Sequence, residues 1–221
     1  MDNKAIRLEA RRLLAGKWGK LALVRLIEYA IYFLTSLSII SVIITGPLTL
    51  GIKTIFLKIW RKEDFKIEEM FNGFKDFGRS LGTYLLMTLY ILLWSILLIV
   101  PGIIAAISYS MTFFILAENP NIKAADALRL SKQMMYGHKT QYFMLMLSFI
   151  GWFLLSILTF GIGFLFLYSY KTMASTIFYQ HIKGEVLYNE IIIENVEQSI
   201  KSPTEGSDES TNQDSTYPDL Y

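Results

Sequence analysis

The chain has 221 residues, of which 53% are hydrophobic, and its mean hydropathy is +0.39. A soluble chain of this length does not usually bury so much apolar side chain, so the composition predicts a membrane protein. The absence of cysteine excludes disulfides, thiolate nucleophiles and cysteine-ligated zinc or iron–sulfur sites. The net charge of +2 hides two parts of opposite sign, because residues 1–184 hold 20 Lys and Arg against 10 Asp and Glu, whereas residues 185–221 hold 1 against 9.

The first predicted membrane arm follows a basic N-terminal segment. Residues 1–20 carry six Lys and Arg around an incomplete apolar stripe, which is typical of an interfacial helix on an anionic leaflet. Residues 21–45 are long enough to cross a membrane, and Arg25 and Glu28 are spaced so that they can pair on one helix face. The pair Gly46–Pro47 is expected to form a turn that ends this arm.

The second predicted arm, residues 48–60, is short. It contains Lys53 and Lys58, so either the lysines extend to the interface or the arm does not cross completely. Residues 61–79 carry mixed charge with apolar side chains near one helical face, and they predict a second interfacial helix.

The longest uncharged stretch of the chain runs from residue 80 to residue 117 and has 38 residues. One straight helix of that length would reach about 57 Å, whereas the hydrocarbon core of a bilayer is only about 30 Å thick. A single span is therefore excluded. We expect a transmembrane hairpin with its turn at Pro101–Gly102, since Pro fixes its own φ and Gly tolerates the positive φ of a tight turn.

The last third of the chain repeats this plan. Residues 118–139 are polar and predict a third interfacial helix. Residues 141–159 form a further arm, Gly161 and Gly163 allow a turn, and residues 164–179 form the final arm, which carries Lys171. Residues 185–221 are predicted to be an acidic, largely disordered cytoplasmic tail.

These pieces suggest three hairpin-like units in a helical membrane domain of residues 1–184. The units are about 1–60, 61–118 and 119–184, and their arms begin near Gly19, Gly78 and Gly137, which are 59 and 59 residues apart. Short loops alone also make a polytopic protein look periodic, so chance periodicity is the alternative. The predicted fold is an all-α transmembrane bundle of about six arms with interfacial amphipathic helices.

The distribution of basic residues predicts the topology. The three predicted turns carry no charge, whereas residues 1–20, 58–79 and 118–139 carry six, six and four Lys and Arg. By the positive-inside rule, both termini of this multi-pass protein are cytoplasmic and the turns face outward across the cell membrane.

Several segments resemble a known family. They are YSMTFFILAENP at 109–120, GRSLGTYLLM at 78–87, LLIVPGII at 97–104, ALRLSKQMMYGHK at 127–139 and SFIGWFLLSILTFGIG at 148–163. Together they resemble a bacterial family of integral membrane proteins known as domain of unknown function nine-seven-five, over about residues 6–184. The resemblance implies a multi-pass membrane protein and carries no established activity.

The first functional hypothesis is a non-catalytic membrane component that interacts with lipid or with a partner membrane protein. Three basic segments on one side of the bilayer would attract anionic headgroups, although basic flanks also serve simply to set topology. Glu118 either pairs with Lys139 or Arg79 at the cytoplasmic end of the bundle, or is only a polar stop after a membrane arm.

The alternative is a small transporter or channel subunit. Arg25, Glu28, Lys53 and Lys171 are the ionisable residues expected at membrane depth, and such residues are functional candidates by default. An enzyme is not expected, because the chain has only two histidines and none of the common catalytic motifs. We expect no catalytic residue, cofactor, metal site or nucleic-acid partner.

Overall fold

The computed structural model describes residues 2–35, 40–159 and 161–201, and these residues are mainly helical. The helices are α1 (Asn3–Leu14), α2 (Trp18–Thr35), α3 (Ile40–Trp60), the 3-10 helix η1 (Ile67–Asp76), α4 (Phe77–Leu97), α5 (Ile99–Ser108), α6 (Thr112–Glu118), α7 (Ala124–Met134), α8 (Lys139–Leu147), α9 (Ile150–Leu158) and α10 (Ile162–Lys201). The chain divides into two units, Met1–Gly184 and Glu185–Tyr221. In the second unit, residues 185–201 belong to α10, and the predicted disordered stretch from residue 202 onward lies outside the described residues.

Four helical stretches of the described chain are long and apolar enough to cross a membrane. They are Ser41–Trp60, Ile67–Ile96, Ile99–Glu118 and Lys139–Leu158. An α-helix satisfies its own backbone hydrogen bonds and can therefore lie in hydrocarbon. The chain is thus all-α with the features of a multi-pass membrane protein. The first and last of the six predicted arms, which fall on α2 and α10, are not among these four stretches.

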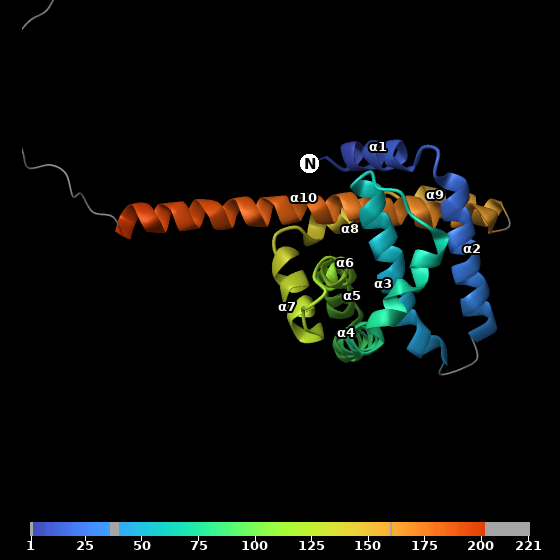
Figure 1. Cartoon of the computed structure of the whole chain (residues 1–221), viewed down its shortest axis with the longest axis horizontal. Helices are drawn as coiled ribbons and strands as arrows, with labels where there is room; N and C mark the ends of the chain where they lie inside the picture. Colours follow the sequence, from blue (N-terminus) through green and yellow to red (C-terminus); the bar gives the residue numbers. More distant parts are fainter. Residues whose placement is uncertain (1, 36–39, 160, 202–221) are drawn as a thin grey trace, which may run out of the picture. The chain divides into compact units, whose positions relative to one another are not determined.

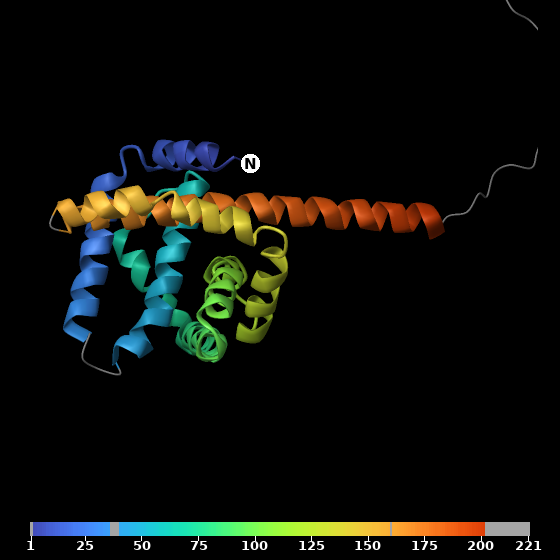
Figure 2. The ribbon, with the colours of Figure 1, turned by 180° about the vertical axis from the view of Figure 1, so that it is seen from behind.

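The helices of the first unit run in three different directions. In Figure 1 α2 and α3 stand upright, α4 and α5 are seen nearly end-on, and α9 and the adjoining part of α10 run across the view. Figure 2 shows the same arrangement from behind. The helices α1, η1 and α7 precede these three pairs along the chain.

The predicted turn at Gly46–Pro47 is absent, because α3 continues through both residues. The glycines of this region instead allow η1 and the start of α4 to pack closely against α3. A methyl group on Gly51 would overlap the carbonyl oxygen of Met70, and one on Gly73 would overlap that of Pro47. A methyl group on Gly46 would lie 2.6 Å from the carbonyl oxygen of Ser80. Tight contact between η1, the start of α4 and α3 therefore explains these glycines, and residues 48–60 are the second half of one long helix.

The hairpin of α4 and α5 is present, but its break falls at Leu98 instead of Pro101–Gly102. Leu98 is extended, with φ −162° and ψ 148°. Pro101 lies in the first turn of α5, where the N–H that proline lacks would have no partner within the helix. Gly102 is buried, and a methyl group on it would lie 2.9 Å from the Cα of Ser95. The glycine therefore lets α5 approach α4 and has no positive φ.

The third pair of helices uses its two glycines differently. Gly161 lies between α9 and α10 with φ +90°, a conformation that side chains rarely adopt. Gly163 lies inside α10, where a methyl group would come within 2.8 Å of the Cα of Ser156. The first glycine makes the turn and the second permits close packing after it.

The three segments predicted as interfacial helices are mainly helical, and part of each apolar face packs against protein, while Leu8 of α1 and Phe71 and Phe74 of η1 are exposed. Ile6, Ala10 and Leu14 of α1 are fully buried, and α1 contacts α3 and α8. Likewise, η1 buries Met70 against α3, and α7 buries Leu128 beside α4 and α6. Amphipathic periodicity requires an apolar neighbour, but it does not distinguish lipid from another helix.

Candidate functional site

A buried ion pair on α2 is the centre of the candidate site. Arg25 Nη1 donates to Glu28 Oε2 at 2.6 Å, and the two residues are 6% and 8% exposed. Arg25 Nη2 donates to the Thr172 hydroxyl of α10, also at 2.6 Å. The Nε of Arg25 is buried and has no hydrogen-bond partner among the described residues. The guanidinium lies 5.6 Å from the ring centre of Phe56.

This ion pair borders a cavity of about 290 Å³ that is lined by many polar side chains, and we call it the polar cavity. Helices α2, α3, α8 and α10 supply its walls. They contribute Arg25, Glu28, Thr49, Ile52, Lys53, Tyr142, Tyr168, Lys171, Thr172 and Ser175.

Two lysines add to the positive charge of the polar cavity. Lys53 Nζ lies 4.3 Å from the ring centre of Phe114, a fully buried residue, so its ammonium faces an aromatic ring. Neither Lys53 nor Lys171 forms an ion pair with any residue that the structure describes. Three cations and one carboxylate therefore border one space, a formal surplus of two positive charges.

Hydroxyl groups complete the wall on the side of α8 and α10. The Tyr142 hydroxyl and Ser175 Oγ are 3.2 Å apart, and Thr172 Oγ1 donates to the carbonyl of Tyr168 at 2.7 Å. Ser175 Oγ donates to the carbonyl of Lys171 at 3.0 Å, so the single proton of each of these hydroxyls is already used within the protein. The hydroxyls therefore make this wall polar without adding charge.

An apolar groove of about 170 Å³ adjoins the polar cavity. Tyr168 and Lys171 line both spaces, and the groove is otherwise formed by Met146, Phe149, Ile150, Phe153 and Leu167. Ile150 and Phe153 are about half exposed, so the groove lies at the protein surface. A charged space and an apolar surface groove thus share the Lys171 side chain.

Glu118 forms a separate cluster at the end of α6. Its Oε1 accepts hydrogen bonds from Arg61 Nη2 at 2.8 Å and from Gln180 Nε2 at 2.9 Å, and its Oε2 accepts from the Tyr179 hydroxyl at 2.9 Å and Lys183 Nζ at 2.6 Å. The Glu118 side chain is only 6% exposed. The carboxylate therefore ties α6 to α10 and to the end of α3.

The partners predicted for Glu118, Lys139 and Arg79, are not those found. Arg79 donates instead to the backbone carbonyl of Asn119 at 2.7 Å and pairs with Asp76. Lys139 lies at the start of α8 and lines a different cavity with Trp94 and Tyr109. Lys139 and Arg79 were expected at the same cytoplasmic end of the bundle as Glu118, but three of the four donors come from α10.

Comparison with known proteins identifies the family. The family model described as protein of unknown function, DUF975, matches residues 1–108 and 96–186. The chain belongs to this family. Searches of curated proteins and of solved structures found no match.

In this DUF975 chain, sequence reasoning had singled out Arg25, Glu28, Lys53 and Lys171 one at a time. The structure brings all four to the polar cavity. Sequence reasoning missed the hydroxyl residues that line the cavity beside them. A usable signal existed on α10, since Tyr168, Lys171, Thr172 and Ser175 follow helical spacing on one helix face.

Proposed function

We propose that this DUF975 protein is a non-catalytic membrane component that binds an anionic lipid, with the headgroup in the polar cavity and an acyl chain in the adjoining apolar groove. One observation carries the proposal. Arg25, Lys53 and Lys171 surround a space in which Glu28 is the one carboxylate among the lining residues, and Lys171 also borders the groove.

The charge of the polar cavity favours an anion as its ligand. Ionisable side chains at membrane depth are costly unless they are paired or solvated. Glu28 already accepts a short hydrogen bond from Arg25, so the two lysines are left for a further acceptor. A phosphate offers several acceptor oxygens that Arg and Lys bind well.

The groove favours a lipid over a small soluble anion. Its walls are aliphatic and aromatic, and part of it lies at the protein surface. A phospholipid presents a charged headgroup joined to apolar chains, which matches a positive cavity joined to an apolar groove. The second candidate is a small transporter or channel subunit that moves an anion through the polar cavity, favoured by the same four ionisable residues.

The test uses the purified full-length protein in detergent micelles. Phosphatidylglycerol and phosphatidylcholine are titrated against the wild type, the double variant Lys53→Gln/Lys171→Gln, and the control Lys4→Gln/Lys123→Gln, which removes two exposed charges. We expect phosphatidylglycerol to bind the wild type and the control at least tenfold more tightly than it binds the cavity variant. Equal affinity for the two lipids in the wild type would contradict the proposal. Flux of phosphate or chloride into liposomes that is lost in the cavity variant would favour the transporter.

We also propose six membrane arms, formed by the four candidate spans together with α2 and the part of α10 up to Gly184, and cytoplasmic positions for both termini. The three helix pairs run in different directions in Figure 1, and membrane helices tilt by no more than about 40°, so the proposal requires the pairs to align with the bilayer normal in the membrane. The lack of charge at the breaks near Leu98 and Gly161 and the basic residues near the N-terminus support this topology. A reporter that is active only outside the cytoplasm should be active when fused after Leu98 and inactive after Lys183. The reverse pattern would contradict the topology.

The three-unit organisation is likewise a proposal. The contacts that support it link the second unit to the first, the third to the second, and the first to the third. The helix η1 packs on α2 and α3 of the preceding pair, α7 packs on α4 and α6, and α1 packs on α8. Each connecting helix thus contacts at least one helix of another unit, which agrees with three copies of one plan.

A further inference from the structure

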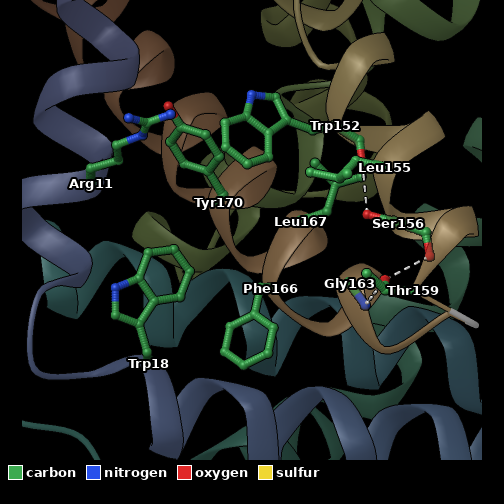
Figure 3. Close-up of a pocket in the computed structure, with 10 residues that line it drawn as sticks. All are labelled: Arg11, Trp18, Trp152, Leu155, Ser156, Thr159, Gly163, Phe166, Leu167 and Tyr170. Atoms are coloured by element: carbon green, nitrogen blue, oxygen red, sulfur yellow. Dashed lines mark hydrogen bonds between the residues drawn. The ribbon is translucent and has the colours of Figure 1, made fainter.

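A second cavity, separate from the polar cavity, lies where α1 and the start of α2 meet α9 and α10. Its volume is about 350 Å³, within the range of roughly 300–1,000 Å³ typical of ligand pockets. We call it the aromatic pocket. Figure 3 shows its lining residues, which are Arg11, Trp18, Trp152, Leu155, Ser156, Thr159, Gly163, Phe166, Leu167 and Tyr170.

Arg11 is the one charged residue in the lining of the aromatic pocket. Its guanidinium carbon lies 5.3 Å from the ring centre of Trp152 and 5.4 Å from that of Tyr170. Figure 3 shows the three side chains grouped together, with Trp18 and Phe166 nearby. Arg11 has no carboxylate partner among the residues that the structure describes. Cation–π attraction to the rings does not use the N–H donors of the guanidinium, and these donors suit a phosphate.

The hydroxyl groups of the aromatic pocket are satisfied by the protein itself, and that of Tyr170 donates to the carbonyl of Arg7 at 3.1 Å. Ser156 Oγ donates to the carbonyl of Trp152 at 2.7 Å, and Thr159 Oγ1 donates to the carbonyl of Ser156 at 3.0 Å. Thr159 Oγ1 also accepts the N–H of Gly163 at 3.1 Å. Away from Arg11 and the indole N–H groups of Trp18 and Trp152, the pocket therefore offers a mainly apolar surface.

We propose that the aromatic pocket holds one acyl chain of an anionic phospholipid, whose phosphate binds Arg11. Charge complementarity and polarity commit the site to this occupant, because one cation stands beside walls that are otherwise aromatic and aliphatic. Tryptophan rings also favour the boundary between headgroups and chains, which is where such a lipid would place its phosphate. The aromatic pocket shares only Leu167 with the apolar groove, so the proposal does not rest on the function assigned to the polar cavity.

The test uses the tryptophans as reporters. The chain has four, and replacing Trp60 and Trp94 with Phe leaves Trp18 and Trp152, which both line the aromatic pocket. In detergent micelles, this full-length background is titrated with phosphatidylglycerol and phosphatidylcholine whose acyl chains carry bromine, which quenches nearby tryptophan fluorescence. We expect half-maximal quenching at a concentration at least fivefold lower for phosphatidylglycerol.

Two matched variants separate the site from general surface charge. Arg11→Gln removes the cation of the pocket, and Arg12→Gln removes an exposed neighbour that does not line it. The preference for phosphatidylglycerol should fall at least threefold in the first variant and stay unchanged in the second. Equal quenching by the two lipids, a smaller loss in Arg11→Gln, or an equal loss in Arg12→Gln would overturn the proposal. Lys53→Gln/Lys171→Gln in the same background should leave the quenching unchanged, so this site and the polar cavity can fail independently.

Discussion

Replacing Glu28 with Gln tests the charge balance of the polar cavity most directly. The substitution keeps the size of the side chain and an oxygen that can accept from Arg25, but it removes the negative charge 2.6 Å from the guanidinium. The formal surplus in the lining rises from two positive charges to three, since Lys53 and Lys171 stay in place. The variant should therefore lose stability and bind anions more strongly.

The expected loss follows from the burial of the pair. Breaking a buried ion pair by removing one partner costs about 3–5 kcal/mol. Gln still accepts a hydrogen bond and the adjoining cavity is large enough to hold water, so we place Glu28→Gln near the lower end, at about 3 kcal/mol. The double variant Arg25→Gln/Glu28→Gln removes both charges and should lose less stability than Glu28→Gln alone, because no unpaired guanidinium is left.

The assay is equilibrium unfolding in mixed micelles with increasing dodecyl sulfate, followed by circular dichroism. Glu63→Gln is the control, since Glu63 is exposed in the loop after α3, and its effect should stay within about 0.5 kcal/mol. A bound ligand stabilises by about 2.7 kcal/mol at a hundred times its dissociation constant. Phosphatidylglycerol should therefore restore more stability to Glu28→Gln than it adds to the wild type.

Two results would refute this reasoning. If the free energy of unfolding of Glu28→Gln lies within about 1 kcal/mol of the wild-type value, the ion pair is solvated, although the low exposure of both residues indicates that it is shielded. If phosphatidylglycerol stabilises the variant no more than the wild type, the added positive charge does not act on a bound anion.

The remaining predictions concern the packing and the ends of helices. Gly51→Ala should destabilise by up to about 2 kcal/mol in the same unfolding assay, because overpacking against the backbone of η1 costs about 1–3 kcal/mol and the helix propensity of Ala returns only about 1 kcal/mol. Gly82→Ala, with nothing within 4 Å, should be neutral or stabilising. Equal stability of the two variants would contradict the packing argument. Glu118→Gln should cost about 1–3 kcal/mol, since four donors lose their charged acceptor, and an unchanged unfolding transition would show that the cluster is dispensable. The backbone N–H of Phe65 and, secondarily, Lys20 hold the pKa of the Asp64 carboxyl below its ordinary value. The stability that the Asp64 carboxylate contributes is therefore present above the unfolded-state pKa of about 3.9. It is lost as the pH falls through the lower pKa of the folded state. Asp64→Asn should flatten this acid-range dependence of the unfolding midpoint, and an unchanged profile would count against it.

Local sequence rules located the helices better than they located the breaks. The uncharged stretch of residues 80–117 had to be interrupted on grounds of length alone, and the structure breaks it. The position of the break is Leu98, because Pro101 fits the first turn of a helix as well as it fits a turn between helices. Glycine is ambiguous in the same way, since it permits both a positive φ and a close approach of two backbones.

The sequence by itself determined the class of this protein, an all-α chain with apolar helices of membrane length, and it marked Arg25, Glu28, Lys53 and Lys171 as unusual. These properties depend on composition and on neighbours within a few residues. Only the tertiary structure decided that α2, α3 and α10 bring the four residues to one cavity, and that Glu118 finds its donors mainly on α10. The physical reason is that an amphipathic face or a buried charge specifies the kind of surroundings it needs, whereas contacts between distant helices select which residues provide them.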